Sequence, residues 1–197
     1  TLNMTYLALF FSRYVNGVAM RHGQISRDMY PGYPIDSITN GVHASTWTAM
    51  PFQRLFDRYI PERRRDNLYL RHAISIPLDE IQQAHAEAKK ELLGEVARRT
   101  GVHLDPNVLT IGFARRATAY KRADLLLYNQ EYLKKIDREV GSLQVIYGGK
   151  AHPRDEGGKV IIKPIFEAAR TIVDTIPIVY LEEYDMTLGK LLCAGVD

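Results

Sequence analysis

The pattern of apolar residues changes about halfway along the chain. In the first half, apolar side chains recur every three or four positions, which predicts helices over 4–15 and 78–100. The helix over 78–100 has the clearer ends, because acidic residues fill its first turn, basic residues fill its last turn and a glycine follows. Between them, turn-forming residues indicate a loop over 31–47, and polar and apolar residues mix over 52–75 in a way that predicts short helices.

The second half contains short continuous apolar runs separated by amphipathic stretches. The predicted strands cover 107–114, 143–147 and 177–182, and the predicted helices cover 123–140, 160–172 and 186–194. Continuous apolar strands that alternate with helices are typical of a parallel sheet covered on both faces. We therefore expect an α/β fold that includes about half of a Rossmann-like domain.

The composition excludes several classes of protein. Hydrophobic residues make up 46% of the chain and charged residues 25%, so it is globular and not disordered. A net charge of +3 over 197 residues argues against a nucleic acid or a membrane as partner, and no run is long enough to span a bilayer. The single cysteine, Cys193, excludes an internal disulfide and fits a cytoplasmic protein. Its apolar neighbours predict that it is buried.

Basic residues gather at two places. The run Arg63 to Arg65 is interpreted as a solvated surface, which is what charge runs usually form. The second group places four cations within eight residues, directly after the predicted strand 107–114: Arg115, Arg116, Lys121 and Arg122. Parallel sheets bind their ligands at the carboxyl ends of the strands, so the second group lies where a ligand is expected.

This basic loop favours a phosphate site. Lys121 and Arg122 precede the predicted helix 123–140, and cations at that end oppose the helix dipole unless an anion is bound between them. The phosphate could be inorganic, part of a cofactor or part of a nucleotide. The alternative is a solvated basic loop without a ligand.

Two further loops follow the other predicted strands. Gly148 and Gly149 allow the backbone to approach a ligand closely, and His152 is either an anion donor or a turn residue. Glu182 and Glu183 are adjacent in an extended segment, so their side chains point in opposite directions and do not form an acid–base pair. The histidines have no metal-ligand spacing, and no metal site is expected.

Trp47 follows a group of turn-forming polar residues at 39–43. An aromatic side chain in that setting suits a sugar or a planar cofactor. The alternative is a tryptophan that caps the core.

Five segments, in order, carry a resemblance to the α-glucan phosphorylases. They are NMTYLALFFSRYVNGVAMRHGQISR (3–27), ITNGVHASTW (38–47), GFARRATAYKR (112–122), YGGKAHP (147–153) and VYLEEYDMTLGKLL (179–192). The third segment is similar to the shorter bacterial and archaeal branch. The resemblance implies the GT-B glycosyltransferase fold, with residues 1–40 ending the N-terminal domain, 41–107 leading into the C-terminal domain and 108–197 forming the first half of its Rossmann-like part.

The resemblance also implies a reaction. Phosphorylases of this family cleave a terminal α-1,4-linked glucose with inorganic phosphate and release glucose 1-phosphate, and they use pyridoxal 5′-phosphate. The phosphate of that cofactor serves as proton donor and acceptor. The implied partners are an α-1,4-glucan and phosphate or glucose 1-phosphate, in the cytoplasm, and a homo-oligomer remains open.

Several site residues follow from the resemblance. Arg116 matches the arginine that holds the substrate phosphate, and Lys121 matches the lysine between the substrate and cofactor phosphates, where it stabilises developing charge. Arg115 stands where the animal enzymes carry a lysine near the cofactor phosphate. Tyr120 matches a tyrosine that contacts the sugar, and Asn40 an asparagine that binds the primary hydroxyl of glucose.

The cofactor ring would lie near Trp47 and Tyr184, which match aromatic residues of the family. Lys150 matches the lysine of the family's GGK loop. Three positions depart from the animal enzymes, which have histidine, arginine and arginine where this chain has Arg13, Thr46 and Asp185. The resemblance therefore does not imply a sugar contact for Arg13, nor the contacts of the animal arginines for Thr46 and Asp185.

The lysine that forms the Schiff base in this family has no match in the chain. We therefore expect an internal piece of a longer enzyme, inactive by itself. Two other functions remain open: a GT-B glycosyltransferase that uses a sugar nucleotide, with the basic loop on its diphosphate, and a non-catalytic glucan-binding fragment.

Overall fold

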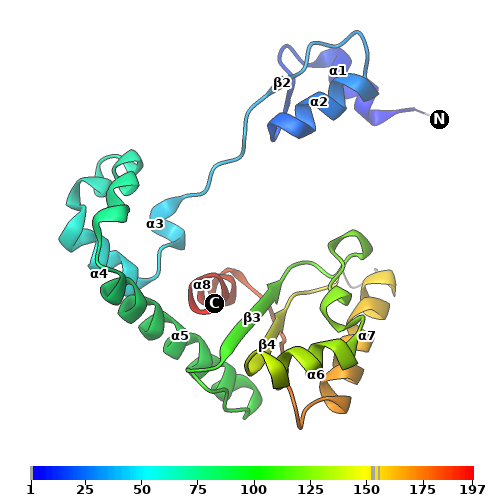
Figure 1. Cartoon of the computed structure of the whole chain (residues 1–197). Helices are drawn as coiled ribbons and strands as arrows, with labels where there is room; N and C mark the ends of the chain where they lie inside the picture. Colours follow the sequence, from blue (N-terminus) through cyan, green and yellow to red (C-terminus); the bar gives the residue numbers. More distant parts are fainter. Residues whose placement is uncertain (1, 152–153, 155) are drawn as a thin grey trace. The chain divides into compact units, whose positions relative to one another are not determined.

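A computed structural model describes residues 2–151, 154 and 156–197 (Figure 1). The chain divides into two compact units, Thr1–His43 and Ala44–Asp197, which are described separately. Over the described residues, no helix has both the length and the apolar character needed to cross a membrane.

The first unit pairs two short helices with two short strands. Its elements are α1 (Met4–Phe11), β1 (Asn16–Gly17), α2 (Met20–Met29) and β2 (Asp36–Ser37). The side chain of Asn3 caps α1 by accepting hydrogen bonds from two backbone amides. The predicted helix over 4–15 is too long, because Ser12 is already extended. Beyond it, Gly17 packs so closely on Gly23 that a β-carbon at 17 would lie 2.5 Å from the Gly23 nitrogen.

The second unit begins with helices. They are α3 (Ala44–Trp47), α4 (Met50–Tyr59), the 3₁₀ helices η1 (Pro61–Arg64) and η2 (Asn67–Ser75), and α5 (Leu78–Thr100). The prediction for α5 is confirmed at both ends, and Gly101 terminates it in the left-handed conformation with φ 73°. Leu55 of α4 and Ala84 of α5 belong to one apolar cluster that joins the two helices.

The arginine run at 63–65 is not uniformly a solvated surface. Arg63 is buried, and its guanidinium lies 2.6 Å from the carboxylate of Asp57 and over the ring of Phe56. Arg64 and Arg65 are exposed, as predicted. A single residue of the run therefore contributes to packing, which a charge pattern alone does not reveal.

A three-stranded parallel sheet forms the centre of the second unit, as predicted. Its strands are β3 (Leu109–Ala114), β4 (Leu143–Gly148) and β5 (Ile178–Leu181), in the order β3-β4-β5. The helices around it are α5, α6 (Gln130–Glu139), α7 (Glu156–Thr171) and α8 (Met186–Gly195). Every residue of the central strand β4 is buried, which explains why its sequence is apolar apart from Gln144.

Helices cover the two faces of this sheet in pairs. Val145 and Tyr147 of β4 belong to a core cluster that contains residues of α6 and α7. Ile146, between them, belongs to a second cluster that contains residues of α5 and α8 (Figure 1). Alternate residues of one strand therefore serve two cores, and the predicted α/β architecture is confirmed for this unit.

Two other predictions in this unit are wrong. The helix expected over 123–140 begins only at Gln130, and the residues before it form the 3₁₀ turns η3 (Ala119–Lys121) and η4 (Leu125–Leu127). Lys121 and Arg122 therefore do not face a helix N-terminus, and the dipole argument for an anion there does not apply. Cys193, expected to be buried, is exposed.

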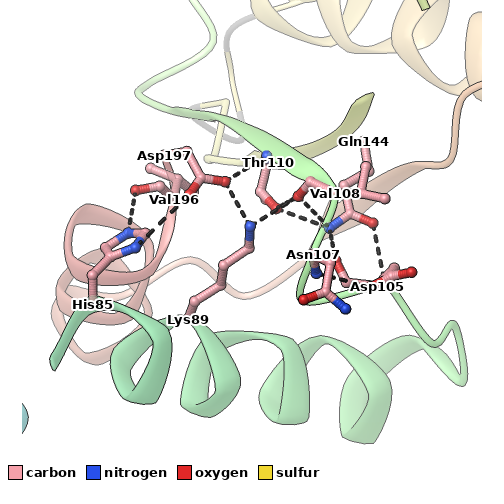
Figure 2. Close-up of polar contacts among 9 residues, drawn as sticks. All are labelled: His85, Lys89, Asp105, Asn107, Val108, Thr110, Gln144, Val196 and Asp197. Carbon is pink, nitrogen blue, oxygen red and sulfur yellow. Dashed lines mark hydrogen bonds and ion pairs between the residues drawn. The ribbon is translucent and has the colours of Figure 1, made fainter. Parts of the chain in front are cut away.

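A buried polar network ties α5 to the amino end of β3 (Figure 2). The ammonium of Lys89 donates to the carbonyl of Val108 and to the carboxylate of Asp197, at 2.8 and 2.7 Å. The same carboxylate accepts from the amide of Thr110, and the Thr110 hydroxyl accepts from Gln144, both at 2.8 Å. The network fixes the start of the sheet, at the end opposite the basic loop.

Candidate functional site

Three loops leave the sheet side by side. Ala114, at the end of β3, pairs with Gly148 at the end of β4, which in turn pairs with Leu181 at the end of β5. The basic loop, the Gly-Gly-Lys loop and the loop after β5 therefore begin at one edge of the sheet, where parallel sheets bind ligands.

The first two loops are coupled through their backbones. The amide of Arg115 donates to the carbonyl of Gly148, and the amide of Ala117 donates to the carbonyl of Lys150, both at 3.2 Å. Gly149 lies between them with φ 157°, and a β-carbon there would be 2.1 Å from the carbonyl oxygen of Arg115. Glycine is thus required here by the neighbouring loop, a reason that the sequence did not reveal.

β3 is at one edge of the three-stranded sheet, which has the order β3-β4-β5. The amide of Thr110 donates to the side-chain carboxylate of Asp197 at 2.8 Å, and the carbonyl of Thr110 accepts from the amide of Asp197 at 3.0 Å. β3 therefore has a backbone neighbour on the edge away from β4, and the chain reaches that edge after α8. Ligands of parallel sheets bind at the carboxyl ends of the strands, and the carboxyl end of β3 leads into Arg115.

The cations of the basic loop have no carboxylate partners among the described residues, unlike Lys89 and Arg63. Arg115, Arg116 and Arg122 are exposed, and the ammonium of Lys121 lies 4.7 Å from the ring centroid of Tyr120. Arg122 adopts the left-handed conformation with φ 52°, unusual for a residue other than glycine. Several uncompensated cations on a tight, partly strained loop are suited to hold an anion.

The third loop contacts the second through side chains. Lys150 lies 3.3 Å from Glu183, which adopts the left-handed conformation with φ 51°. The hydroxyl of Tyr180, in β5, donates to the carbonyl of Gly149 at 3.1 Å. Sequence reasoning missed Tyr180, because an aromatic residue inside an apolar strand looks like an ordinary core residue.

Two predicted aromatic residues, Trp47 and Tyr184, both lie near Gly189 of α8. A β-carbon at Gly189 would lie 2.8 Å from the Tyr184 hydroxyl and 3.9 Å from the Trp47 ring, and one at Gly148 would lie 3.2 Å from the Tyr184 ring. Burial raises the pKa of Tyr184, with smaller contributions from Cys193 and Asp185. Trp47 keeps 38% of its surface exposed, so its ring is open to a planar ligand.

Two predicted residues cannot be placed in this arrangement. Asn40 belongs to the first unit, whereas the basic loop, Lys150, Trp47 and Tyr184 belong to the second. His152 lies outside the described residues. Asp185, one of the departures from the animal enzymes, caps α8 by accepting a hydrogen bond from the amide of Leu188 at 2.8 Å.

Comparisons with known proteins point in one direction. The family model described as carbohydrate phosphorylase matches residues 1–197. Maltodextrin phosphorylase of Thermococcus litoralis is 37% identical over 99% of this chain and 27% of its own length. Glycogen phosphorylase of Aquifex aeolicus is 36% identical over 99% of this chain and 32% of its own length. Glycogen phosphorylase of Mycobacterium tuberculosis is 31% identical over 99% of this chain and 26% of its own length. The chain spans between about a quarter and a third of the length of these curated relatives.

Proposed function

Since the chain belongs to the carbohydrate phosphorylase family, we propose that the protein containing it is an α-glucan phosphorylase, a hexosyltransferase. It transfers the terminal α-1,4-linked glucosyl unit of a glucan to inorganic phosphate and releases glucose 1-phosphate. Two relatives, a maltodextrin phosphorylase and a glycogen phosphorylase, support this substrate class.

One observation carries the proposal beyond the family match. Arg115, Arg116 and Lys121 stand without carboxylate partners in the part of the chain that the structure describes, beside a glycine turn at the carboxyl edge of the sheet. A phosphate would supply the missing negative charge, and guanidinium groups bind its oxygens in pairs.

The roles of the loop residues follow from that chemistry. Arg116 holds the substrate phosphate. Lys121 is a compact charge that stabilises negative charge as the glycosidic oxygen leaves and the phosphate attacks. Tyr120 lies against the Lys121 ammonium and contacts the bound sugar, and Asn40 binds its primary hydroxyl.

Pyridoxal 5′-phosphate is the proposed cofactor, and the residues present fit it. Trp47 offers an exposed ring face, and Tyr184 is wedged between Gly148 and Gly189 next to the loop that carries the cations. Arg115 would face the phosphate of the cofactor. When bound, the cofactor supplies a phosphate group that can give and accept a proton. Lys150 would adjust the local charge, and the Schiff-base lysine is proposed to lie outside residues 1–197.

The same proposal assigns the segments to a GT-B enzyme. Residues 1–40 end the N-terminal domain, 41–107 lead into the C-terminal domain, and 108–197 form the first part of its Rossmann-like sheet. The cleft between two such domains would bring Asn40 to the glucose. Because the Schiff-base lysine is proposed to lie outside residues 1–197, the 197-residue chain by itself is expected to be inactive. We place the enzyme in the cytoplasm, where its glucan and phosphate substrates occur.

Two measurements on the full-length protein test this function. The first follows glucose 1-phosphate formation from an α-1,4-glucan with and without inorganic phosphate, and the proposal requires formation that depends on phosphate. The second determines the intact mass after borohydride reduction, which should show one pyridoxal adduct on a lysine. A folded protein with neither property would contradict the proposal, and transfer from a sugar nucleotide would identify the alternative glycosyltransferase.

A further inference from the structure

We propose that Tyr180 is a positioning residue for the anion-binding loops. Its hydroxyl donates to the carbonyl of Gly149. The carbonyls on either side, those of Gly148 and Lys150, accept hydrogen bonds from the amides of Arg115 and Ala117. The inference rests on the proposed function in one respect: the anion at these loops is taken to be phosphate.

Tyr180 supplies a contact that the sheet cannot make. Pairing between β4 and β5 ends at Gly148 and Leu181, so Gly149 lies one residue beyond the last paired position. The chain after β5 turns away, with Glu183 in the left-handed conformation. The hydroxyl of Tyr180 takes the place of a strand partner by donating to the Gly149 carbonyl at 3.1 Å.

The ring that carries this hydroxyl is itself fixed. It packs on Phe166 of α7 with ring centroids 5.0 Å apart and planes 32° apart. Burial raises the pKa of Tyr180, and the charge of Glu182 adds to the effect, so the phenol remains a protonated donor at neutral pH.

Gly149 and its neighbours connect the Tyr180 hydroxyl to the backbone of the basic loop. On its other side, the carbonyl of Arg115 is so close that no side chain fits at 149. The next carbonyl, that of Lys150, accepts from the amide of Ala117 at 3.2 Å. A rotation of the Gly149–Lys150 peptide would therefore shift the backbone on both sides of Arg116, the residue assigned to the substrate phosphate.

The Tyr180→Phe variant of the full-length protein tests this inference, because it removes the hydroxyl and keeps the ring. Tyr132→Phe is the matched control: Tyr132 lies on α6 and is 60% exposed. Inorganic phosphate is titrated calorimetrically into each protein, and KM for phosphate and kcat are measured in phosphorolysis. The loss of one net hydrogen bond predicts about a fivefold rise in both Kd and KM for phosphate, with kcat changed less than about twofold.

Other results would overturn the inference. Equal phosphate affinity in Tyr180→Phe and Tyr132→Phe, even with a lowered Tm, would mean that the hydroxyl only stabilises the fold. A wild-type protein that does not bind phosphate would also overturn it. A wild-type protein that binds phosphate but makes no glucose 1-phosphate would refute the proposed function alone, and the two Kd values would still decide the role of Tyr180. Faster hydrogen exchange over residues 113–122 in Tyr180→Phe would give independent support.

Discussion

The ammonium of Lys89 lies 2.7 Å from the carboxylate of Asp197, joining two residues 108 positions apart (Figure 2). Lys89 is 5% exposed, so it is a charge inside the protein that is matched by a partner. Burial alone would raise the pKa of Asp197, but Lys89 and the amide of Thr110 outweigh it and hold that pKa below its usual value. The pair therefore stabilises the contact of α5 with the start of β3.

Replacement of Lys89 by methionine should loosen this end of the sheet. The stem is kept, but Asp197 loses its buried cation, at a cost of about 3 kcal/mol. Hydrogen exchange in the full-length protein should accelerate over residues 108–112, where the Thr110 amide donates to Asp197. Lys90→Met, at an exposed position on the same helix, is the control and should exchange as the wild type does. Identical exchange in both variants would show that the pair contributes no stability.

Alkaline pH should reveal the buried Tyr147. Burial, together with the charge of Asp124, raises the pKa of Tyr147 to about 12, whereas an unfolded tyrosine ionises near pH 10. The unfolded state therefore loses its proton first, and the contribution to stability is complete below about pH 10 and disappears between about pH 10 and 12.

Tyr147→Phe separates this effect from general alkaline damage. Among the described residues the Tyr147 hydroxyl has no hydrogen-bond partner, so the variant should be at least as stable as the wild type at pH 8. Its Tm should fall less than that of the wild type between pH 8 and 10.5, and Tyr132→Phe should behave as the wild type. An equal fall in Tyr147→Phe would contradict the assignment.

Thr118, in the basic loop, has a buried hydroxyl without a partner in the part of the chain that the structure describes. Valine has the same shape and removes the unpaired polar atom, so Thr118→Val should raise stability by about 1 kcal/mol. The measurement is the Tm of the full-length protein without phosphate. A lower phosphate affinity in this variant, with no gain in Tm, would instead mean that the hydroxyl contacts the anion.

The sequence predicted the sheet better than the loops. The strand 143–147 is recognisable because a strand buried on both faces is mostly apolar, and its one polar residue, Gln144, is buried and hydrogen-bonded. The helix α5 is recognisable because its two ends carry charges that match the helix dipole. The helix expected from residue 123 begins only at Gln130, because Ala123 is buried from a turn and Leu127 from the 3₁₀ helix η4.

The site was predictable in type but not in construction. The cations after β3 and the glycines after β4 can be read from the strand ends. The hydroxyl of Tyr180 on Gly149, the carbonyl of Arg115 against the same glycine and the burial of Arg63 depend on distances between segments far apart in the sequence. No local pattern encodes them, because each is decided by tertiary packing.

The central claim is that Arg116 binds the phosphate that attacks the glucan. The most direct test measures kcat/KM for inorganic phosphate in glucose 1-phosphate formation by the full-length wild type, Arg116→Ala and the exposed control Arg65→Ala. Loss of a charge-assisted pair of hydrogen bonds predicts about a 30-fold lower kcat/KM for Arg116→Ala and no change for Arg65→Ala. Equal values for all three proteins would contradict the account.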